Sequence, residues 1–252
     1  MTMPMPATAI SLPPPPVPAR DWALFLDVDG CLIEFTDVPE DVSVQPGVVD
    51  RLLALSGMLD GALALVSGRR IAMLDRMFAP ALFPAAGLHG LERRLDAGTV
   101  ALAGEGGADM RGIVEDARQA LAPFPGALVE DKGVALALHW RAAPEAAASA
   151  MAFAEGALAR LSGYRLQPGD HVVELKPGAA DKGTAIAAFL EHAPFRGRMP
   201  VFAGDDLTDE HGFDVVNARG GISILVGGRT GSVARHGLAD PAAVRDWLGV
   251  AR

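Results

Sequence analysis

The sequence predicts an α/β fold: a doubly wound parallel-sheet (Rossmann-like) core with an inserted α+β cap domain. Two observations predict it. Short apolar segments alternate with helical segments in the first and last thirds of the chain, which is typical of parallel βαβ units. The middle third has the pattern of antiparallel hairpins. The chain has 252 residues, enough to bury the cores of two modest domains.

The first third predicts the beginning of the parallel sheet. Residues 22–26 form an apolar run that ends at Asp27, as expected for a buried strand opening into a loop. The elements expected after it are a helix over 46–59, a strand over 62–66, a helix over 71–78 and a strand over 83–88.

The remaining elements divide into the insertion and the end of the core. In the insertion we expect a helix over 110–122, a hairpin of 127–130 and 134–141, a helix over 144–161 and a hairpin of 164–166 and 171–175. The parallel pattern then resumes with a helix over 182–192, strands over 200–203 and 221–226, and a helix over 241–248. These elements assign residues 21–106 and 177–252 to the core and residues 107–176 to the cap.

The N-terminal residues 1–20 are predicted to form a flexible, Pro-rich tail, since Pro13 to Pro16 are consecutive prolines. They lack the pattern of a secretory signal, and no apolar run of the chain reaches the roughly 18 residues of a membrane span. The single cysteine, Cys31, rules out an intrachain disulfide and fits a reducing compartment. We therefore expect a cytoplasmic protein.

The net charge of −9 argues against broad electrostatic capture of nucleic acid. It permits an anionic small molecule, because a bound cation and a few local Lys or Arg residues can reverse the field inside one cleft. We expect a monomer with a small-molecule partner, and neither nucleic acid nor a membrane as a partner.

Asp27-Val28-Asp29-Gly30 places two acids at the carboxyl end of the first strand, where open α/β sheets bind ligands. One carboxylate there can attack phosphorus, and the other can protonate a leaving oxygen and activate water. The alternative is an ordinary turn, in which Asp and Gly are common.

Gly204-Asp205-Asp206-Leu207-Thr208-Asp209 follows another expected strand. Clustered carboxylates repel one another unless a cation is bound, so the segment predicts a hard oxygen site suited to Mg²⁺. The alternative is a solvated acidic turn.

Two further motifs carry candidates for phosphate binding. In Ser67-Gly68-Arg69 a hydroxyl and exposed backbone N–H groups can cradle a phosphate, although the motif alone favours a plain helix cap by Ser67. Arg69 is expected to pair with the phosphate, the alternative being a surface charge. In Asp181-Lys182-Gly183 the lysine can neutralise a transferring phosphoryl group, with Lys176 as the competing candidate.

The four motifs in this order, with the insertion between the second and third, resemble the haloacid dehalogenase superfamily of phosphatases. The resemblance implies a Mg²⁺-dependent phosphomonoester hydrolase with Asp27 as nucleophile and Asp29 as general acid and base. It implies that Ser67 and Lys182 hold the phosphoryl group. The implied metal ligands are Asp27, the main-chain carbonyl of Asp29, Asp205 and, in support or as a further ligand, Asp206. The family usually has Thr where Cys31 stands, a difference of modest expected effect.

Segments of the insertion narrow the resemblance to trehalose-6-phosphate phosphatases. They are Glu130-Asp131-Lys132-Gly133, Leu138-His139-Trp140-Arg141 and Val173-Glu174-Leu175-Lys176-Pro177. The resemblance implies hydrolysis of trehalose 6-phosphate, with sugar contacts from Glu130, Lys132, His139, Arg141 and Glu174. Alternation along residues 134–141 puts His139 and Arg141 on one strand face. Without the resemblance, the pattern favours an ordinary half-exposed sheet with a polar solvent face.

Three alternatives remain open. The first is another capped sugar phosphatase, acting on sucrose phosphate or a mannosyl phosphate. The second is a non-enzymatic phospho-acceptor such as a receiver domain, although receiver domains lack such an insertion. The third is a binding-only descendant of the fold, against which the intact Asp27/Asp29 pair argues.

Overall fold

The computed structural model describes residues 12–34, 44–95, 101–102, 110–161, 163–178 and 180–250. The chain divides into two compact units. Residues 1–101 and 181–252 form one unit, here called the core, and residues 102–180 form the other, here called the cap. Each unit has its own cluster of buried apolar side chains.

An eight-stranded sheet organises the core, in the order β12-β11-β10-β1-β2-β3-β4-β5. Its strands are β1 (Trp22–Leu26), β2 (Leu63–Val66), β3 (Ala85–Gly87), β4 (Glu92–Arg94), β5 (Ala101–Leu102), β10 (Met199–Gly204), β11 (Ile222–Val226) and β12 (His236–Leu238). β1 pairs in parallel with both β10 and β2, while β4 runs antiparallel to β3. The strand order reverses direction at β1, which confirms the predicted doubly wound core.

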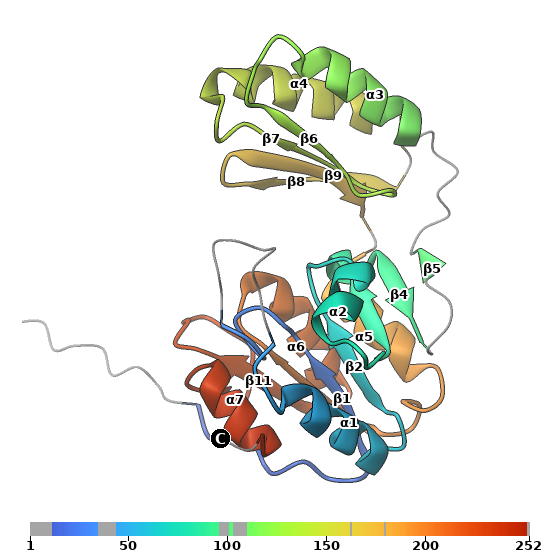
Figure 1. The fold of residues 1–252 in the computed structure, drawn as a ribbon, viewed down its shortest axis with the longest axis vertical. Helices are drawn as coiled ribbons and strands as arrows, with labels where there is room; N and C mark the ends of the chain where they lie inside the picture. The colour runs from blue at the N-terminus through green and yellow to red at the C-terminus, as the bar shows by residue number, and fades with distance from the viewer. Residues whose placement is uncertain are drawn as a thin grey trace, which may run out of the picture. The chain divides into compact units, whose positions relative to one another are not determined.

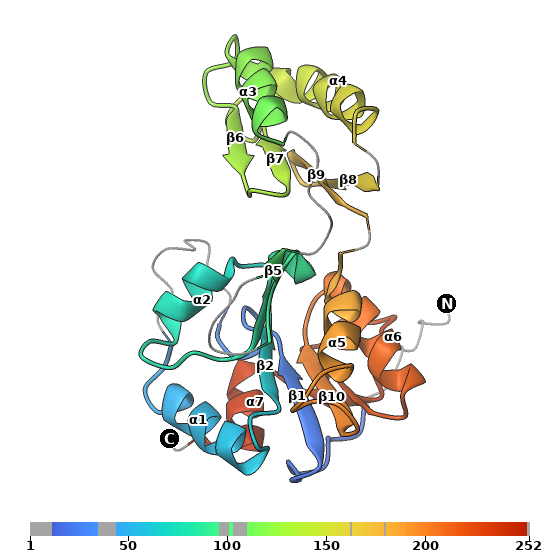
Figure 2. The same cartoon turned by 90° about the vertical axis from the view of Figure 1, so that its right-hand side faces the viewer.

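Helices cover both faces of this sheet (Figure 2). α1 (Val48–Met58) and α2 (Ile71–Met77) lie on one face, and α5 (Lys182–Leu190) and α6 (Glu210–Ala218) lie on the opposite face. α7 (Pro241–Leu248) packs beside α1, where Arg51 Nε donates to the Leu248 carbonyl at 2.5 Å.

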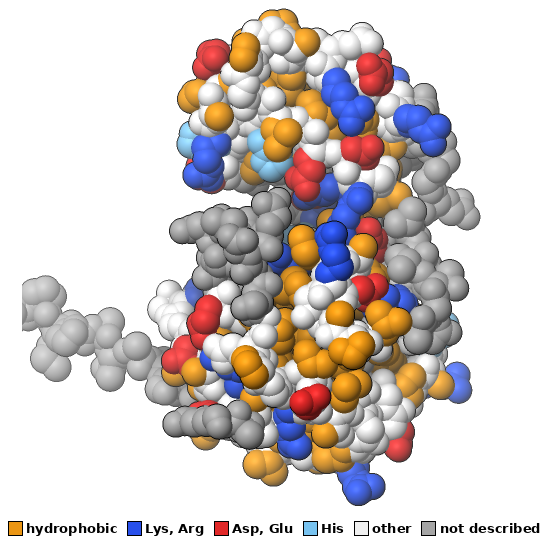
Figure 3. All heavy atoms as spheres, viewed as in Figure 1, with side chains coloured by type: hydrophobic (Ala, Val, Ile, Leu, Met, Phe, Trp, Pro, Cys, Tyr) orange, Lys and Arg blue, Asp and Glu red, His pale blue; other side chains and the backbone are white. Residues whose placement is uncertain are grey.

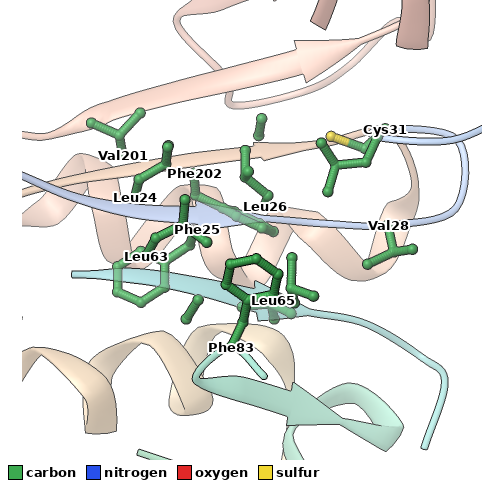
Figure 4. Close-up of a cluster of buried hydrophobic side chains, with 14 of the residues drawn as sticks. Leu24, Phe25, Leu26, Val28, Cys31, Leu63, Leu65, Phe83, Val201 and Phe202 are labelled. Atoms are coloured by element: carbon green, nitrogen blue, oxygen red, sulfur yellow. The ribbon is translucent and has the colours of Figure 1, made fainter. Parts of the chain in front are cut away.

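The central strands are apolar along their whole length because both of their faces are covered. All five residues of β1 are buried. Leu24 and Leu26 lie beside Leu63 and Leu65 of β2 in the buried cluster of Figure 4. Phe25 also stacks on Phe195, with ring centroids 5.4 Å apart. This packing fixes the carboxyl end of β1, where Asp27 lies.

The cap is a four-stranded antiparallel sheet in the order β6-β7-β9-β8 with helices against it (Figure 1). Its elements are α3 (Met110–Leu121), β6 (Leu128–Asp131), β7 (Leu136–His139), α4 (Ala147–Leu158), β8 (Tyr164–Gly169) and β9 (Val172–Pro177). Buried Leu136 and Leu138 of β7 and Val173 and Leu175 of β9 share one cluster with residues of α3 and α4. The predicted hairpins and helices of the insertion are thus confirmed.

Part of the segment predicted to be a flexible tail makes defined contacts. Residues 1–11 lie outside the described residues. Leu12 packs against the core cluster, and the Pro13 carbonyl accepts a hydrogen bond from Gly237 N of β12 at 3.0 Å. The Pro16 carbonyl accepts one from Trp247 Nε1 of α7 at 2.7 Å. Proline lacks an N–H but keeps its carbonyl acceptor, so these two prolines can still accept hydrogen bonds. Through these contacts residues 12–16 cover β12, an outer strand of the sheet.

The surface mixes charges of both signs. On the face shown in Figure 3, Lys and Arg side chains lie among Asp and Glu side chains in both units. No helix in the described ranges is long and apolar enough to cross a membrane.

Candidate active site

The predicted catalytic segments meet at one edge of the core sheet. β1, β2 and β10 are neighbours that run in parallel, so their carboxyl ends lie together. Asp27 follows β1, Ser67 follows β2 and Asp205 follows β10. Asp27 and Ser67 are 5% and 1% exposed, so these polar side chains are held in the interior rather than in a solvated turn.

Lys182 lies at the centre of this edge. Its Nζ is 2.9 Å from Asp27 Oδ2 and 2.7 Å from Asp209 Oδ1. Lys182 is the first residue of α5, and Asp181 caps that helix by accepting from Thr184 N at 2.7 Å. The competing candidate, Lys176, lies in β9 of the cap, whereas Lys182 shares the core unit with Asp27.

Asp27, Asp205 and Asp209 form the acidic group of this edge. Each offers one carboxylate oxygen, and these oxygens all lie within 4.8 Å of one another. Gly30 makes the approach possible, because a Cβ there would lie 2.2 Å from Asp205 Oδ2. Its φ of +73° is also a conformation that glycine adopts without strain.

Burial and crowding raise the pKa of all three carboxyls. Desolvation raises the pKa of Asp27 to about 6, although Lys182 opposes the shift. Desolvation together with Asp209 and Asp206 raises the pKa of Asp205 to about 6. Desolvation and Asp27 raise the pKa of Asp209 to about 8. Three such carboxyls with one ammonium group fit a divalent cation, because a cation would relieve their repulsion.

The acidic group contains two of the predicted metal ligands, Asp27 and Asp205, but not Asp206; for Asp29 the predicted ligand was the main-chain carbonyl, not the carboxylate. The carboxylate of Asp206 caps the turn after β10, accepting from Thr208 N at 2.7 Å and Thr208 Oγ1 at 2.6 Å. The carboxylate of Asp29 binds Arg69 instead. Asp209 belongs to the segment predicted to hold Mg²⁺ but was not named as a ligand, and its carboxylate is the third member of the group. The motif GDDLTD carried a signal for its role: Asp209 follows Asp206 by three residues, and one 3₁₀ turn brings residues at that spacing to the same side.

Asp209 also holds the loop that carries Asp205. It is fully buried, and its Oδ2 accepts from Asp205 N and Asp206 N, each at 2.9 Å. One carboxylate therefore connects Lys182 with the backbone of the acidic loop.

Arg229 supports the same loop from the segment between β11 and β12, and sequence analysis did not find it. Its Nη2 donates to the Asp206 carbonyl at 3.1 Å and pairs with Glu210 at the start of α6. A lone arginine after a strand carries no sequence signal for this role. Its contact with the Asp206 carbonyl arises because β11 lies next to β10 in the sheet.

Arg69 and Asp29 form a two-pronged ion pair. Arg69 Nε donates to Asp29 Oδ2 and Nη2 donates to Oδ1, each at 2.7 Å. Arg69 was predicted to contact substrate, and the structure places it on the carboxylate predicted to be the general acid and base.

Ser67 is not the cap of α2. That helix begins at Ile71 after Arg70, without a side-chain cap, so the capping alternative is wrong. Ser67 Oγ accepts from Arg69 N at 3.1 Å, which curls the segment around Gly68. Such a curl turns backbone N–H groups to one side, as an anion requires.

Cys31, the departure from the usual Thr, packs among apolar side chains beneath the loop (Figure 4). Burial raises the pKa of its thiol. It is therefore a protonated packing residue rather than a reactive thiolate.

The cap carries a polar cluster of its own on β6, β7 and β9. Glu130 of β6 and Glu174 of β9 both lie opposite Ala137 of β7. Lys132 Nζ lies 3.1 Å from Glu174 Oε1 and 3.8 Å from Glu130 Oε2. His139 Nε2 lies 3.0 Å from Glu130 Oε2. Four of the five predicted cap residues therefore form one cluster.

Arg141 is the predicted cap residue outside this cluster. It lies two residues beyond the end of β7, and its side chain is 73% exposed. Its Nη2 donates to Asp170 Oδ2 at 2.8 Å. The alternation that grouped it with His139 stops where the strand stops.

Comparison with known proteins identifies the family of the chain. The family model for trehalose-phosphatase matches residues 25–242. A probable trehalose-phosphate phosphatase of Sinorhizobium fredii is 46% identical over 208 residues, which cover 82% of this chain and 78% of the relative. A trehalose-6-phosphate phosphatase of Escherichia coli is 44% identical over 228 residues, which cover 90% and 85% respectively.

A solved structure shares the fold. The C-terminal domain of a Candida albicans trehalose-6-phosphate phosphatase superposes with a TM-score of 0.70 at 21% identity, covering 91% of each chain. The matches of sequence confirm the resemblance predicted from the motifs. The chain belongs to the trehalose-phosphatase family.

Proposed function

We propose that this protein hydrolyses trehalose 6-phosphate to trehalose and inorganic phosphate. The observation that carries the proposal is Asp27, a buried carboxylate held 2.9 Å from the Lys182 ammonium at the ligand-binding edge of the sheet. The names of the relatives support this substrate.

In the proposed reaction Asp27 attacks phosphorus in line and forms an aspartyl-phosphate. Asp29 protonates the departing sugar oxygen and then takes a proton from the attacking water. Lys182 neutralises charge on the phosphoryl group, and the N–H group of Gly68 binds one of its oxygens. Ser67 holds that segment in its curled form through the contact with Arg69 N.

A divalent cation fits the acidic group of Asp27, Asp205 and Asp209, and we propose Mg²⁺ because all the donors are oxygens. The ion would supply charge neutralisation, allowing the carboxylate of Asp27 to approach an anionic phosphate. Asp27 and Asp205 would hold it through their side chains and Asp29 through its main-chain carbonyl. Asp206 and Asp209 would support these ligands.

The polar cluster of the cap is the proposed sugar-binding surface. Carboxylates and an ammonium group accept and donate the several hydrogen bonds that adjacent sugar hydroxyls offer. Glu130, Lys132 and Glu174 are already held together, so little side-chain entropy is lost on binding. His139 extends the cluster, and Arg141 is a contact only if it leaves Asp170.

The test is phosphate release from a panel of trehalose 6-phosphate, sucrose 6-phosphate, mannose 6-phosphate and a mannosyl phosphate, with Mg²⁺ or with excess EDTA. We expect kcat/KM for trehalose 6-phosphate to exceed the others by at least about 100-fold, since lost polar contacts in a built site are costly. EDTA should abolish the activity. Equal rates across the panel would reject the substrate, and full activity in EDTA would reject the metal.

A further inference from the structure

The turn between β3 and β4 has an unusual backbone. Leu88, His89 and Gly90 have φ angles of +48°, +54° and +101°. Residues with a Cβ rarely adopt such angles, and they keep them only where their surroundings enforce the conformation. Strained backbone of this kind is frequent at functional sites, so the contacts of the turn indicate what it positions.

One side of the turn holds the Ser67–Arg69 segment. His89 N donates to the Ser67 carbonyl, and Leu88 N donates to the Arg69 carbonyl, each at 2.9 Å. The His89 ring lies over Gly68, where an added Cβ would come within 2.8 Å of ring atoms Cε1 and Nε2. The carbonyls of Ser67 and Arg69 are thereby tied down, which fixes the curled conformation of the segment.

The other side of the turn packs on the start of α5. A Cβ at Gly90 would lie 2.6 Å from the Asp181 carbonyl oxygen and 3.1 Å from the Ala185 Cβ. Asp181 is the residue before Lys182 and the cap of the helix. Any change in the turn at Gly90 would therefore displace the backbone that carries Lys182.

We propose that the turn Leu88–Gly90 is a positioning element that sets the spacing between the Ser67–Arg69 segment and Lys182, and that His89 is its positioning residue. The left-handed backbone of His89 aims its N–H at Ser67 while placing Gly90 against Asp181. The turn touches neither substrate nor metal in this scheme. The proposal rests on the phosphate-binding part of the proposed function and not on the identity of the sugar.

The first test compares Gly90→Ala with Gly197→Ala. Both substitutions force alanine to a positive φ, but nothing lies within 4 Å of the added Cβ at Gly197. The readouts are kcat for 4-nitrophenyl phosphate and competitive inhibition by inorganic phosphate, both with Mg²⁺, beside urea unfolding. Gly90→Ala should lower kcat and weaken phosphate binding by at least about tenfold, a modest loss for a displaced Lys182. Gly197→Ala should stay within about twofold for both readouts, while losing stability through the same backbone strain.

The second test uses His89 and keeps the glycines intact. Asparagine tolerates the left-handed region and valine does not. His89→Val should weaken inhibition by phosphate by about tenfold, as expected for strain of this size, and His89→Asn should recover most of that loss. Urea unfolding of both variants is measured in parallel. It separates a change in phosphate binding from a general loss of stability, so recovery of binding by asparagine reports on the backbone of the turn.

The proposal is overturned if Gly90→Ala and Gly197→Ala reduce kcat and phosphate binding equally. It is also overturned if His89→Val, shown to be folded, binds phosphate as the wild type does. Both readouts use a simple aryl phosphate and inorganic phosphate. Failure of the trehalose 6-phosphate assignment would therefore appear only in the sugar panel and leave this test intact.

Discussion

The guanidinium group of Arg69 binds both carboxylate oxygens of Asp29, with Nε and Nη2 each 2.7 Å from their acceptors. The side chains are 13% and 25% exposed, so the pair is shielded from full solvent screening. This contact fixes the orientation of Asp29 while leaving its carboxylate partly exposed.

Arg69→Met should therefore impair catalysis through Asp29. We expect kcat for trehalose 6-phosphate to fall by at least about 100-fold, the lower range of a general acid–base contribution. Arg69→Lys should recover little, because an ammonium group cannot make the two-pronged contact. Steady-state kinetics with Mg²⁺ measure the effect, and Arg76→Met on the exposed side of α2 is the control. A kcat within a few-fold of wild type for Arg69→Met would contradict this role.

Lys182→Met should destabilise the core. The ammonium group is 2% exposed and pairs with Asp27 and Asp209, so its loss leaves two buried carboxylates without their cation. We expect a loss of about 3–5 kcal/mol, measured by urea unfolding at pH 8 in EDTA. Adding Asp209→Asn should offset part of that loss, because it removes one uncompensated charge. A double variant as unstable as the sum of the single variants would show that the groups are independent.

Stability in EDTA should fall as the pH rises. The folded-state pKa values of Asp27, Asp205 and Asp209 are raised from 3.8 to about 6, 6 and 8. Between about pH 4 and 8 the folded state therefore binds more protons than the unfolded state, so these carboxyls reduce the free energy of unfolding as they ionise. Excess Mg²⁺ should flatten the decline, because it binds the ionised form.

Urea unfolding across pH 5 to 9 measures this slope. Asp209→Asn should make the slope in EDTA shallower, whereas Asp214→Asn, on an exposed position of α6, should leave it unchanged. A free energy of unfolding that rises over this range in EDTA would contradict the account of the acidic group.

Glu174→Gln should affect the sugar and spare the chemistry. The change weakens the contact with Lys132, whose Nζ lies 3.1 Å from Glu174 Oε1. We expect kcat/KM for trehalose 6-phosphate to fall by about 10–100-fold, as for a lost charged hydrogen bond. Hydrolysis of 4-nitrophenyl phosphate, which has no sugar, should stay unchanged. The matched control is Glu155→Gln, exposed on α4 of the same unit; equal losses on both substrates would argue against sugar binding by this cluster.

The sequence predicted the central elements well because their signals are local. β1, β2 and β10 are apolar runs that end at Asp27, Ser67 and Gly204, and both of their faces are buried. β4 (Glu92–Arg94) and β12 (His236–Leu238) were not predicted. They are short outer strands that lack an apolar run, and their pairing depends on neighbours distant in the sequence.

The site was predictable where motif and strand end coincide. Asp27 came from such a motif at the end of β1, and Lys182 came from a motif at the start of helix α5; the two side chains lie together. The partners of Arg69 and Asp206 were not predictable, because the choice between binding a substrate and binding a protein group depends on distances across the sheet edge. The left-handed turn at His89 could not be predicted, because its only sequence signal is a His-Gly pair.

The nucleophilic role of Asp27 is tested most directly by the stereochemical course at phosphorus. The measurement uses the 6-phosphorothioate analogue of trehalose 6-phosphate, made chiral at phosphorus with two oxygen isotopes and hydrolysed in water that carries the third, and determines the configuration of the released thiophosphate. Attack by Asp27 followed by attack of water on the aspartyl-phosphate comprises two in-line displacements, so the account predicts overall retention. Inversion would mean that water attacks the substrate directly, and would contradict a covalent role for Asp27.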